Sequence, residues 1–111
     1  MSSPQGFTVE IDDADDDLVI RVKGELDMAA TPGLSEAILQ AKDRGRITLD
    51  LSGVTFLDSS AIGALVASGR EVSQAGGRLE IGPRSDIVNR VLEITGLAET
   101  SEAFDVLPGD G

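Results

Sequence analysis

The stretch "RITLDLSGVTFLDSSAIGALVASGREVSQAGGRLEI", residues 46–81, holds the pattern that decides the fold. Its first six residues, 46–51, alternate between polar and apolar side chains, which predicts a strand with one buried face. From residue 59, helical spacing continues up to Gly76-Gly77, and the predicted inward stripe is Ile62, Leu65, Val66 and Val72. The segment "RLEI", residues 78–81, is again a short strand. This strand, helix and strand predict a parallel pair joined by a right-handed crossover.

The residues before this stretch predict a hairpin and a helix. "FTVEI" (7–11) and "LVIRVKG" (18–24) alternate as strands do, and the acidic run "DDADDD" (12–17) connects them. A helix is expected to begin near Thr31-Pro32 and to stop at Gly45. Its inward residues at helical spacing are Leu34, Ala37, Ile38 and Ala41.

The residues after it predict one more helix and one more strand. "SDIVNRVLEITG" (85–96) has a serine at its start and a glycine at its end, as helices commonly do. The residues expected to face inward are Ile87, Val88, Val91 and Leu92. A last short strand is expected near "FDV" (104–106).

This order of elements predicts an α/β fold in one domain over residues 1–111, with a core at about 7–106 and flexible ends at 1–6 and 107–111. We expect a single mixed, mostly parallel sheet in sequential strand order, with its helices packed on one face. The other face is then open to solvent, and its residues are Arg21, Lys23, Thr48, Asp50 and Glu80. Gly24 and Gly53 are expected in tight backbone turns.

Composition restricts the chemistry. The chain has no cysteine and no histidine, which excludes disulfides, thiolate catalysis, a serine-histidine triad and histidine metal sites. Twenty acidic against nine basic residues give a net charge of −11, which disfavours nucleic acids and anionic membranes as partners. The aspartate run lacks the glycine and the closing glutamate of a calcium loop, so a solvated turn is favoured over a metal site. We expect a cytoplasmic protein that is not an enzyme, binds no cofactor and recognises another protein.

The segment "FLDSSAIGAL", residues 56–65, has two interpretations. Asp58 is a favoured N-cap residue and Ser59 suits a first turn, so the segment can simply start a helix. Alternatively, Ser59 is a modification site, because the N-terminus of a helix favours added negative charge such as a phosphate. In the predicted strand order, Asp27 lies on the neighbouring loop. The residues alone leave both interpretations open.

Four segments together resemble the STAS domain (sulfate transporter and anti-sigma-factor antagonist), in particular its small bacterial anti-sigma-factor antagonists. They are "VKGELDMAATPGL", "LDLSGVTFLDSSAIGAL", "AGGRLEI" and "VLEITGL", and the resemblance covers about residues 7–106. It implies that Ser59 is phosphorylated by an ATP-using serine kinase that is also the anti-sigma factor. Flanking or partner-binding positions are then Asp27, Met28, Thr31, Asp58 and Ser60.

The resemblance also implies a monomer when free, a partner switch that frees a sigma factor, and a phosphatase as a further partner. Two departures from the family pattern stand out. Ala61 occupies a position where a glycine is common, and "LPGDG" (107–111) stands where many members carry a further helix.

Two other functions fit the predicted fold. A receiver domain would use an aspartyl phosphate, but Asp50 lies on the polar face of its strand and no lysine follows Lys42, which disfavours it. A scaffold or accessory subunit of a stress-signalling or lipid-transport complex would keep the fold without phosphorylation. Phosphate incorporation by a kinase separates this function from a partner switch.

Overall fold

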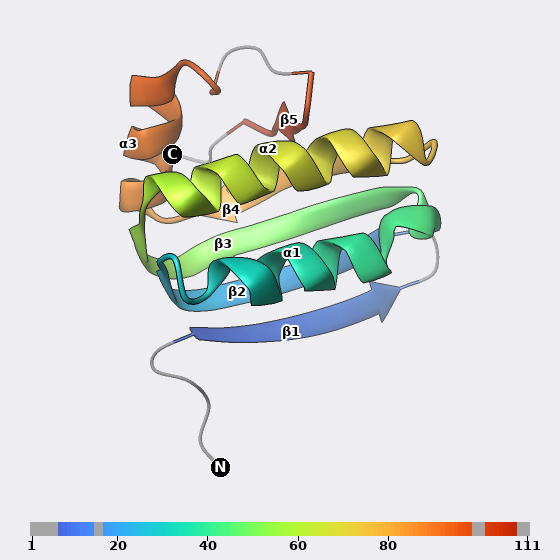
Figure 1. Ribbon diagram of the computed structural model, residues 1–111, viewed down its shortest axis with the longest axis horizontal. Helices are drawn as coiled ribbons and strands as arrows, with labels where there is room; N and C mark the ends of the chain where they lie inside the picture. The colour runs from blue at the N-terminus through green and yellow to red at the C-terminus, as the bar shows by residue number, and fades with distance from the viewer. Residues whose placement is uncertain (1–6, 15–16, 99–101, 109–111) are drawn as a thin grey trace.

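The computed structural model describes residues 7–14, 17–98 and 102–108. They form a five-stranded sheet and three α-helices in an α/β arrangement (Figure 1). The elements are β1 (Phe7–Ala14), β2 (Asp17–Leu26), α1 (Thr31–Gln40), a 3-10 turn η1 (Lys42–Arg44), β3 (Arg46–Leu57), α2 (Ser59–Gln74), β4 (Arg78–Arg84), α3 (Asp86–Thr95) and β5 (Asp105–Val106).

The sheet has the sequential order β1-β2-β3-β4-β5, as the alternating strands predicted. The β1 and β2 strands pair as an antiparallel hairpin, and all later neighbours are parallel. This order differs from the 2-1-3-4-5 order of flavodoxin-like receiver folds, so the receiver alternative is wrong at the level of topology. Flexible ends were predicted at 1–6 and 107–111, and of these, residues 1–6 and 109–111 lie outside the described residues, as does the middle of the acidic connection at 15–16.

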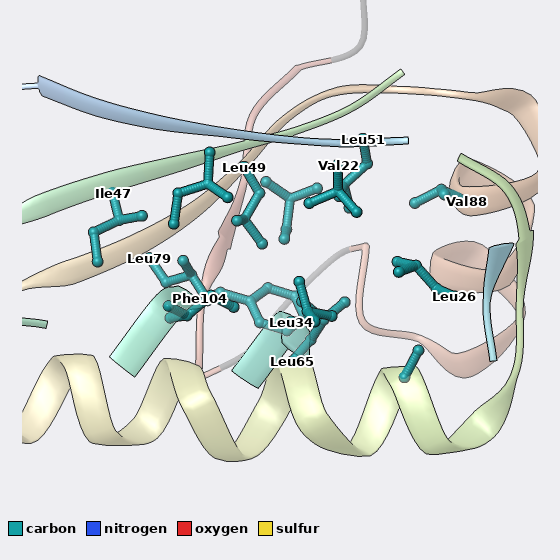
Figure 2. Packing of buried hydrophobic residues seen from close by; sticks show 14 of the residues in the cluster. Val22, Leu26, Leu34, Ile47, Leu49, Leu51, Leu65, Leu79, Val88 and Phe104 are labelled. Atoms are coloured by element: carbon teal, nitrogen blue, oxygen red, sulfur yellow. The ribbon is translucent and has the colours of Figure 1, made fainter. Parts of the chain in front are cut away.

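Both α1 and α2 lie across the same face of the sheet (Figure 1), and all three helices contribute to one core cluster. Figure 2 shows Leu34 of α1 and Leu65 of α2 directed toward strand residues such as Leu49. All three of these side chains are fully buried. The core therefore fills the space between the sheet and its helices, as predicted.

The opposite face of the sheet carries the polar residues predicted for it. Lys23 is exposed, and Arg21, Thr48, Asp50 and Glu80 are half-buried. Arg21 lies 3.5 Å from an Asp12 oxygen and 3.6 Å from an Asp50 oxygen, which joins three strands across this face. Solvent screens such pairs, so each stabilises the fold only weakly.

The inward stripes predicted for the second and third helices were confirmed in part, and the predicted end of the first helix was wrong. On α2, the predicted Leu65 and Val72 are buried, and the predicted Ile62 and Val66 are half-buried and packed against the core. The helix also buries Ala61, Ser68 and Gly69, which were not predicted. On α3, Ile87 is 38% exposed, because Val88 and Leu92 form its buried stripe. The helix predicted to run to Gly45 ends at Gln40 and is followed by the 3-10 turn.

The two glycines predicted in tight turns both lie inside strands. Gly24 has φ of 101° at an irregularity in the β2–β3 register, so its left-handed backbone does require glycine. Gly53 is not among the positive-φ glycines of the described residues, and the prediction of a turn there was wrong. A Cβ at Gly53 would lie 2.7 Å from Cγ of Lys23, so a close side-chain approach explains this glycine. The strand predicted over 46–51 continues through this position to Leu57.

The carboxyl-terminal segment is tied to the sheet beyond β5. The N–H of Leu107 donates to the carbonyl oxygen of Ile81 at 2.9 Å, and Arg84 donates to the carbonyl oxygen of Leu107 at 3.0 Å. Phe104 is 1% exposed and belongs to the core. None of the described helices combines the length and apolar composition needed to cross a bilayer.

Candidate functional site

Asp58 starts helix α2 as its N-cap. Its backbone is extended, and its Oδ1 accepts hydrogen bonds from the N–H groups of Ser60 at 3.0 Å and Ala61 at 3.2 Å. A side-chain cap of this kind stabilises a helix by about 1 kcal/mol. Asp58 therefore has a structural role, whatever else it does.

Ser59 is the first residue of α2, and its side chain is exposed. Its hydroxyl forms no hydrogen bond with any residue in the described part of the chain. Ser60 is half-buried, and its backbone N–H is bound to Asp58. Of the two adjacent serines, Ser59 is therefore the more accessible to another protein.

The first turn of a helix can bind a phosphate through free backbone N–H groups. Those of Ser60 and Ala61 are already bound by Asp58. The backbone N–H of Ser59, which forms no hydrogen bond within the described chain, remains for an added anion. So does the positive end of the helix dipole, typically 0.3–1 kcal/mol at an exposed site. A phosphate placed here would therefore gain only a modest stabilisation from the helix start.

The loop that holds Asp27 follows β2 and is internally hydrogen-bonded. The Oδ1 of Asp27 accepts from the N–H of Ala30 at 3.1 Å, and its carbonyl oxygen accepts from the N–H of Thr31 at 3.1 Å. The Thr31 hydroxyl also donates to that carbonyl oxygen, at 3.0 Å. Asp27 and Thr31 together fix the turn that leads into α1.

The two loops lie side by side, as the crossover argument predicted. Leu26 and Leu57 are paired at the ends of β2 and β3, and the N–H of Asp58 donates to the carbonyl oxygen of Leu26 at 3.2 Å. Figure 1 shows α1 and α2 beginning at the same end of the sheet. Asp27 and Asp58, the residues that immediately follow this pair, are thereby placed on adjacent segments.

The site is acidic and partly apolar. Neither Asp27 nor Asp58 forms an ion pair with an arginine or lysine of the described segments. Two large apolar side chains are exposed on the same segments, Met28 at 72% and Phe56 at 46%. The arrangement offers an accessible hydroxyl next to carboxylates, with apolar groups that another protein can cover.

Phe56 was missed from the sequence. Ile47, Leu49 and Leu51 occupy the inward positions of β3, and the same alternation would have turned residues 53, 55 and 57 inward. The predicted strand ended at residue 51, so the outward position that this alternation gives Phe56 was not considered. The register with β2 shifts near Gly53, and that shift accounts for the buried Val54. A shift in strand register has no reliable signal in a single sequence.

Comparison with known proteins gives a consistent result. Residues 8–107 match the family model described as the STAS domain. The anti-sigma-B factor antagonist of Listeria monocytogenes is 32% identical over 103 residues, which cover 90% of this chain and 90% of that protein. The crystal structure of an anti-sigma factor antagonist from Mycobacterium paratuberculosis has a TM-score of 0.78 at 29% identity, covering 97% of this chain and 91% of that one.

A third similar structure is that of the Bacillus cell fate determinant SpoIIAA in its phosphorylated form. It has a TM-score of 0.64 at 25% identity, covering 92% of this chain and 91% of that one. The mixed five-stranded sheet with three helices agrees with these structures. The matched family model spans nearly the whole chain, and this chain belongs to the STAS domain family.

Proposed function

We propose that this protein is an anti-sigma factor antagonist, which binds an anti-sigma factor and so frees a sigma factor. The names of its relatives support this function, because proteins of similar length and sequence carry it in Listeria monocytogenes and Mycobacterium tuberculosis. The site supports it as well, since an acidic surface with exposed apolar side chains suits a protein partner. In this role the chain is a binding protein and not an enzyme.

The regulation we propose is phosphorylation of Ser59. The observation that carries it is the exposed hydroxyl of Ser59 at the first turn of α2, next to the half-buried Ser60. The solved phosphorylated form of the similar SpoIIAA adds support, because it shows that a related chain of this fold accepts a phosphate. The partner is then an anti-sigma factor with ATP-dependent serine kinase activity, and a phosphatase resets the switch.

Electrostatics explains why the phosphate blocks binding. A phosphoserine adds about −1.5 to −2 charge near Asp27 and Asp58, which have no ion-pair partner in the described chain. Covering this phosphate with a partner removes its hydration, and an unpaired buried ion costs several kcal/mol. A loss of that size reduces affinity on the order of a hundredfold or more. The unmodified, monomeric, cytoplasmic protein is the binding form in this proposal.

The test uses the purified protein with its anti-sigma factor, ATP and magnesium. We expect mass spectrometry to find phosphate on Ser59 in the wild type and in Ser60→Ala, the matched neighbouring control. Ser59→Ala should accept no phosphate yet bind the anti-sigma factor. Ser59→Asp should bind more weakly, although less so than the phosphoprotein, because aspartate has less charge and fewer acceptor oxygens.

Two results would contradict parts of this proposal. Efficient phosphorylation of Ser59→Ala at Ser60 would show that the wrong serine was chosen. Tight partner binding without any kinase-dependent phosphate would instead indicate a scaffold or accessory subunit that uses the same surface without a phosphorylation switch.

A further inference from the structure

Met28 is an exposed side chain that contains sulfur. The sequence contains two methionines and no cysteine, so Met1 and Met28 are its only sulfur-containing residues. Met1 lies outside the described residues, whereas Met28 is 72% exposed. Exposed methionine is oxidised by peroxides and restored by methionine sulfoxide reductases. Met28 is therefore the side chain in the described structure that is open to reversible oxidation.

The local backbone holds Met28 outward. It follows Asp27 in the turn closed by the hydrogen bonds from the N–H groups of Ala30, at 3.0 Å, and Thr31, at 3.1 Å, to the Asp27 carbonyl oxygen. Ala30 is buried, which anchors the other side of the turn in the core. The turn is fixed at both ends, so the exposure of Met28 follows from an ordered backbone.

Met28 also lies next to the segment that contains Ser59. Its loop is joined to the start of α2 by the hydrogen bond from the N–H of Asp58 to the carbonyl oxygen of Leu26. A partner that covers Ser59 and the Asp27 loop would therefore cover the Met28 side chain. Such a partner would remove the apolar thioether from water, which is favourable for binding.

We propose that Met28 is an oxidation site, and that peroxide acting on it weakens docking of the anti-sigma factor independently of Ser59. This inference rests on the proposed function. The thioether sulfur attacks one peroxide oxygen, the O–O bond breaks, a sulfur–oxygen bond forms and water leaves. The sulfur is oxidised and the peroxide is reduced.

The product explains the loss of affinity. Methionine sulfoxide is polar and an acceptor of hydrogen bonds, so covering it without a donor is unfavourable. The loss of one large buried apolar contact typically costs about tenfold or more in affinity. Oxidation of Met28 is therefore a second way to lower the affinity of this surface for the anti-sigma factor, and it needs no kinase.

The test treats the unphosphorylated protein with hydrogen peroxide. We expect peptide mass spectrometry to find one added oxygen atom on Met28, and we expect the dissociation constant for the anti-sigma factor to rise about tenfold or more. Methionine sulfoxide reductase should restore the original value. Met28→Gln, which has a polar side chain of similar length, should reproduce the weakening without peroxide.

Two variants serve as controls. Met28→Leu has no sulfur at this position, so its affinity should be the same before and after peroxide. Ile11→Gln changes another exposed apolar residue, 54% accessible, that pairs with Ile20 six residues before Leu26 on β2. At about 3.3 Å per residue this is roughly 20 Å from the end of the strand, so binding should not change.

The outcomes separate the two proposals. Unchanged affinity of the Met28-oxidised protein, or an equal effect of peroxide on Met28→Leu, would overturn the role of Met28 and leave the proposed function standing. A folded, unoxidised and unphosphorylated protein that fails to bind the anti-sigma factor would overturn the proposed function, and this inference with it.

Discussion

Replacing Gly69 by alanine tests the packing of the carboxyl-terminal segment against α2. Gly69 is a buried residue of this helix, and a Cβ added to it would overlap the carbonyl oxygen of Ala103 and lie 2.8 Å from its carbonyl carbon. Ala103 and Phe104 are 2% and 1% exposed, so this segment has little room to move. The missing side chain at Gly69 is therefore what allows residues 103–104 to reach the core.

The expected magnitude follows from two opposing effects. In a helix interior, alanine is more favourable than glycine by about 1 kcal/mol. Forcing an extra methyl group into a packed core costs about 1–3 kcal/mol. Gly63 provides the matched control, because it lies exposed in the same helix and a Cβ there would meet nothing within 4 Å. Gly63→Ala should therefore stabilise the protein, whereas Gly69→Ala should be neutral or destabilising.

The difference between the two variants isolates the packing cost, since helix propensity is common to both. We expect Gly69→Ala to have a free energy of unfolding about 1–3 kcal/mol below that of Gly63→Ala. Urea unfolding should be followed by far-ultraviolet circular dichroism, because the chain has no tryptophan or tyrosine. Equal stabilisation by both substitutions would refute the close packing of residues 103–104 on α2.

Three further predictions concern the site and the sheet. Asp27→Asn keeps an oxygen to accept the Ala30 N–H, so thermal melts should show a change within about 0.5 kcal/mol, whereas kinase assays should show altered phosphorylation of Ser59. Gly24→Ala forces alanine into a φ of 101° and should cost about 1–2 kcal/mol in urea unfolding. Hydrogen bonds from Arg78 lower the pKa of Asp105 in the folded protein. The pair therefore stabilises the fold fully above the unfolded-state pKa of about 3.9. This contribution is lost as the pH falls through the lower pKa of the folded state. Urea unfolding between about pH 3 and 6 should show a smaller loss of stability toward acid in Arg78→Gln than in the wild type.

Each of these predictions has a contradicting outcome. Unaltered phosphorylation of Asp27→Asn would remove Asp27 from the site. A Gly24→Ala variant as stable as the wild type would show that the left-handed backbone at this position is not required. If the free energy of unfolding falls equally toward acid pH in Arg78→Gln and in the wild type, the Arg78–Asp105 pair does not contribute to the pH dependence of stability.

The sheet could be predicted because its signals are local and repeated. Alternation in residues 18–24 and 46–51 gave each strand its buried face, and one exposed face implied sequential strand order. Gly76 and Gly96 ended their helices with positive φ, as terminal glycines do. These features depend on neighbouring residues in the chain and need no knowledge of distant contacts.

The orientation of α2 could not be predicted in the same way. A search for large apolar residues finds Ile62 and Val66, which are half-buried against the core, but it does not find the small residues Ser68 and Gly69, which the helix buries more deeply. At Gly69 the reason is the approach of Ala103, more than thirty positions later in the chain. Burial of small residues is a property of tertiary packing, which periodicity alone does not contain.

The candidate site was predictable in position and less so in detail. Crossover geometry brought the Asp27 and Asp58 loops together, and the Asp58 N–H to Leu26 hydrogen bond confirms it. The exposed Phe56 lies beyond residue 51, where the predicted strand ended, and the structure shows that the strand continues to Leu57. The occupation of first-turn N–H groups by Asp58 likewise needed the side-chain geometry.

The central claim is that a phosphate on Ser59 controls partner binding, and calorimetric titration of the anti-sigma factor with two homogeneous forms of the protein tests it directly. One form is unmodified and the other carries phosphoserine at position 59 alone. We predict tight binding of the unmodified form and an affinity on the order of a hundredfold lower for the phosphorylated form. Equal affinities of the two forms for the anti-sigma factor would contradict the claim.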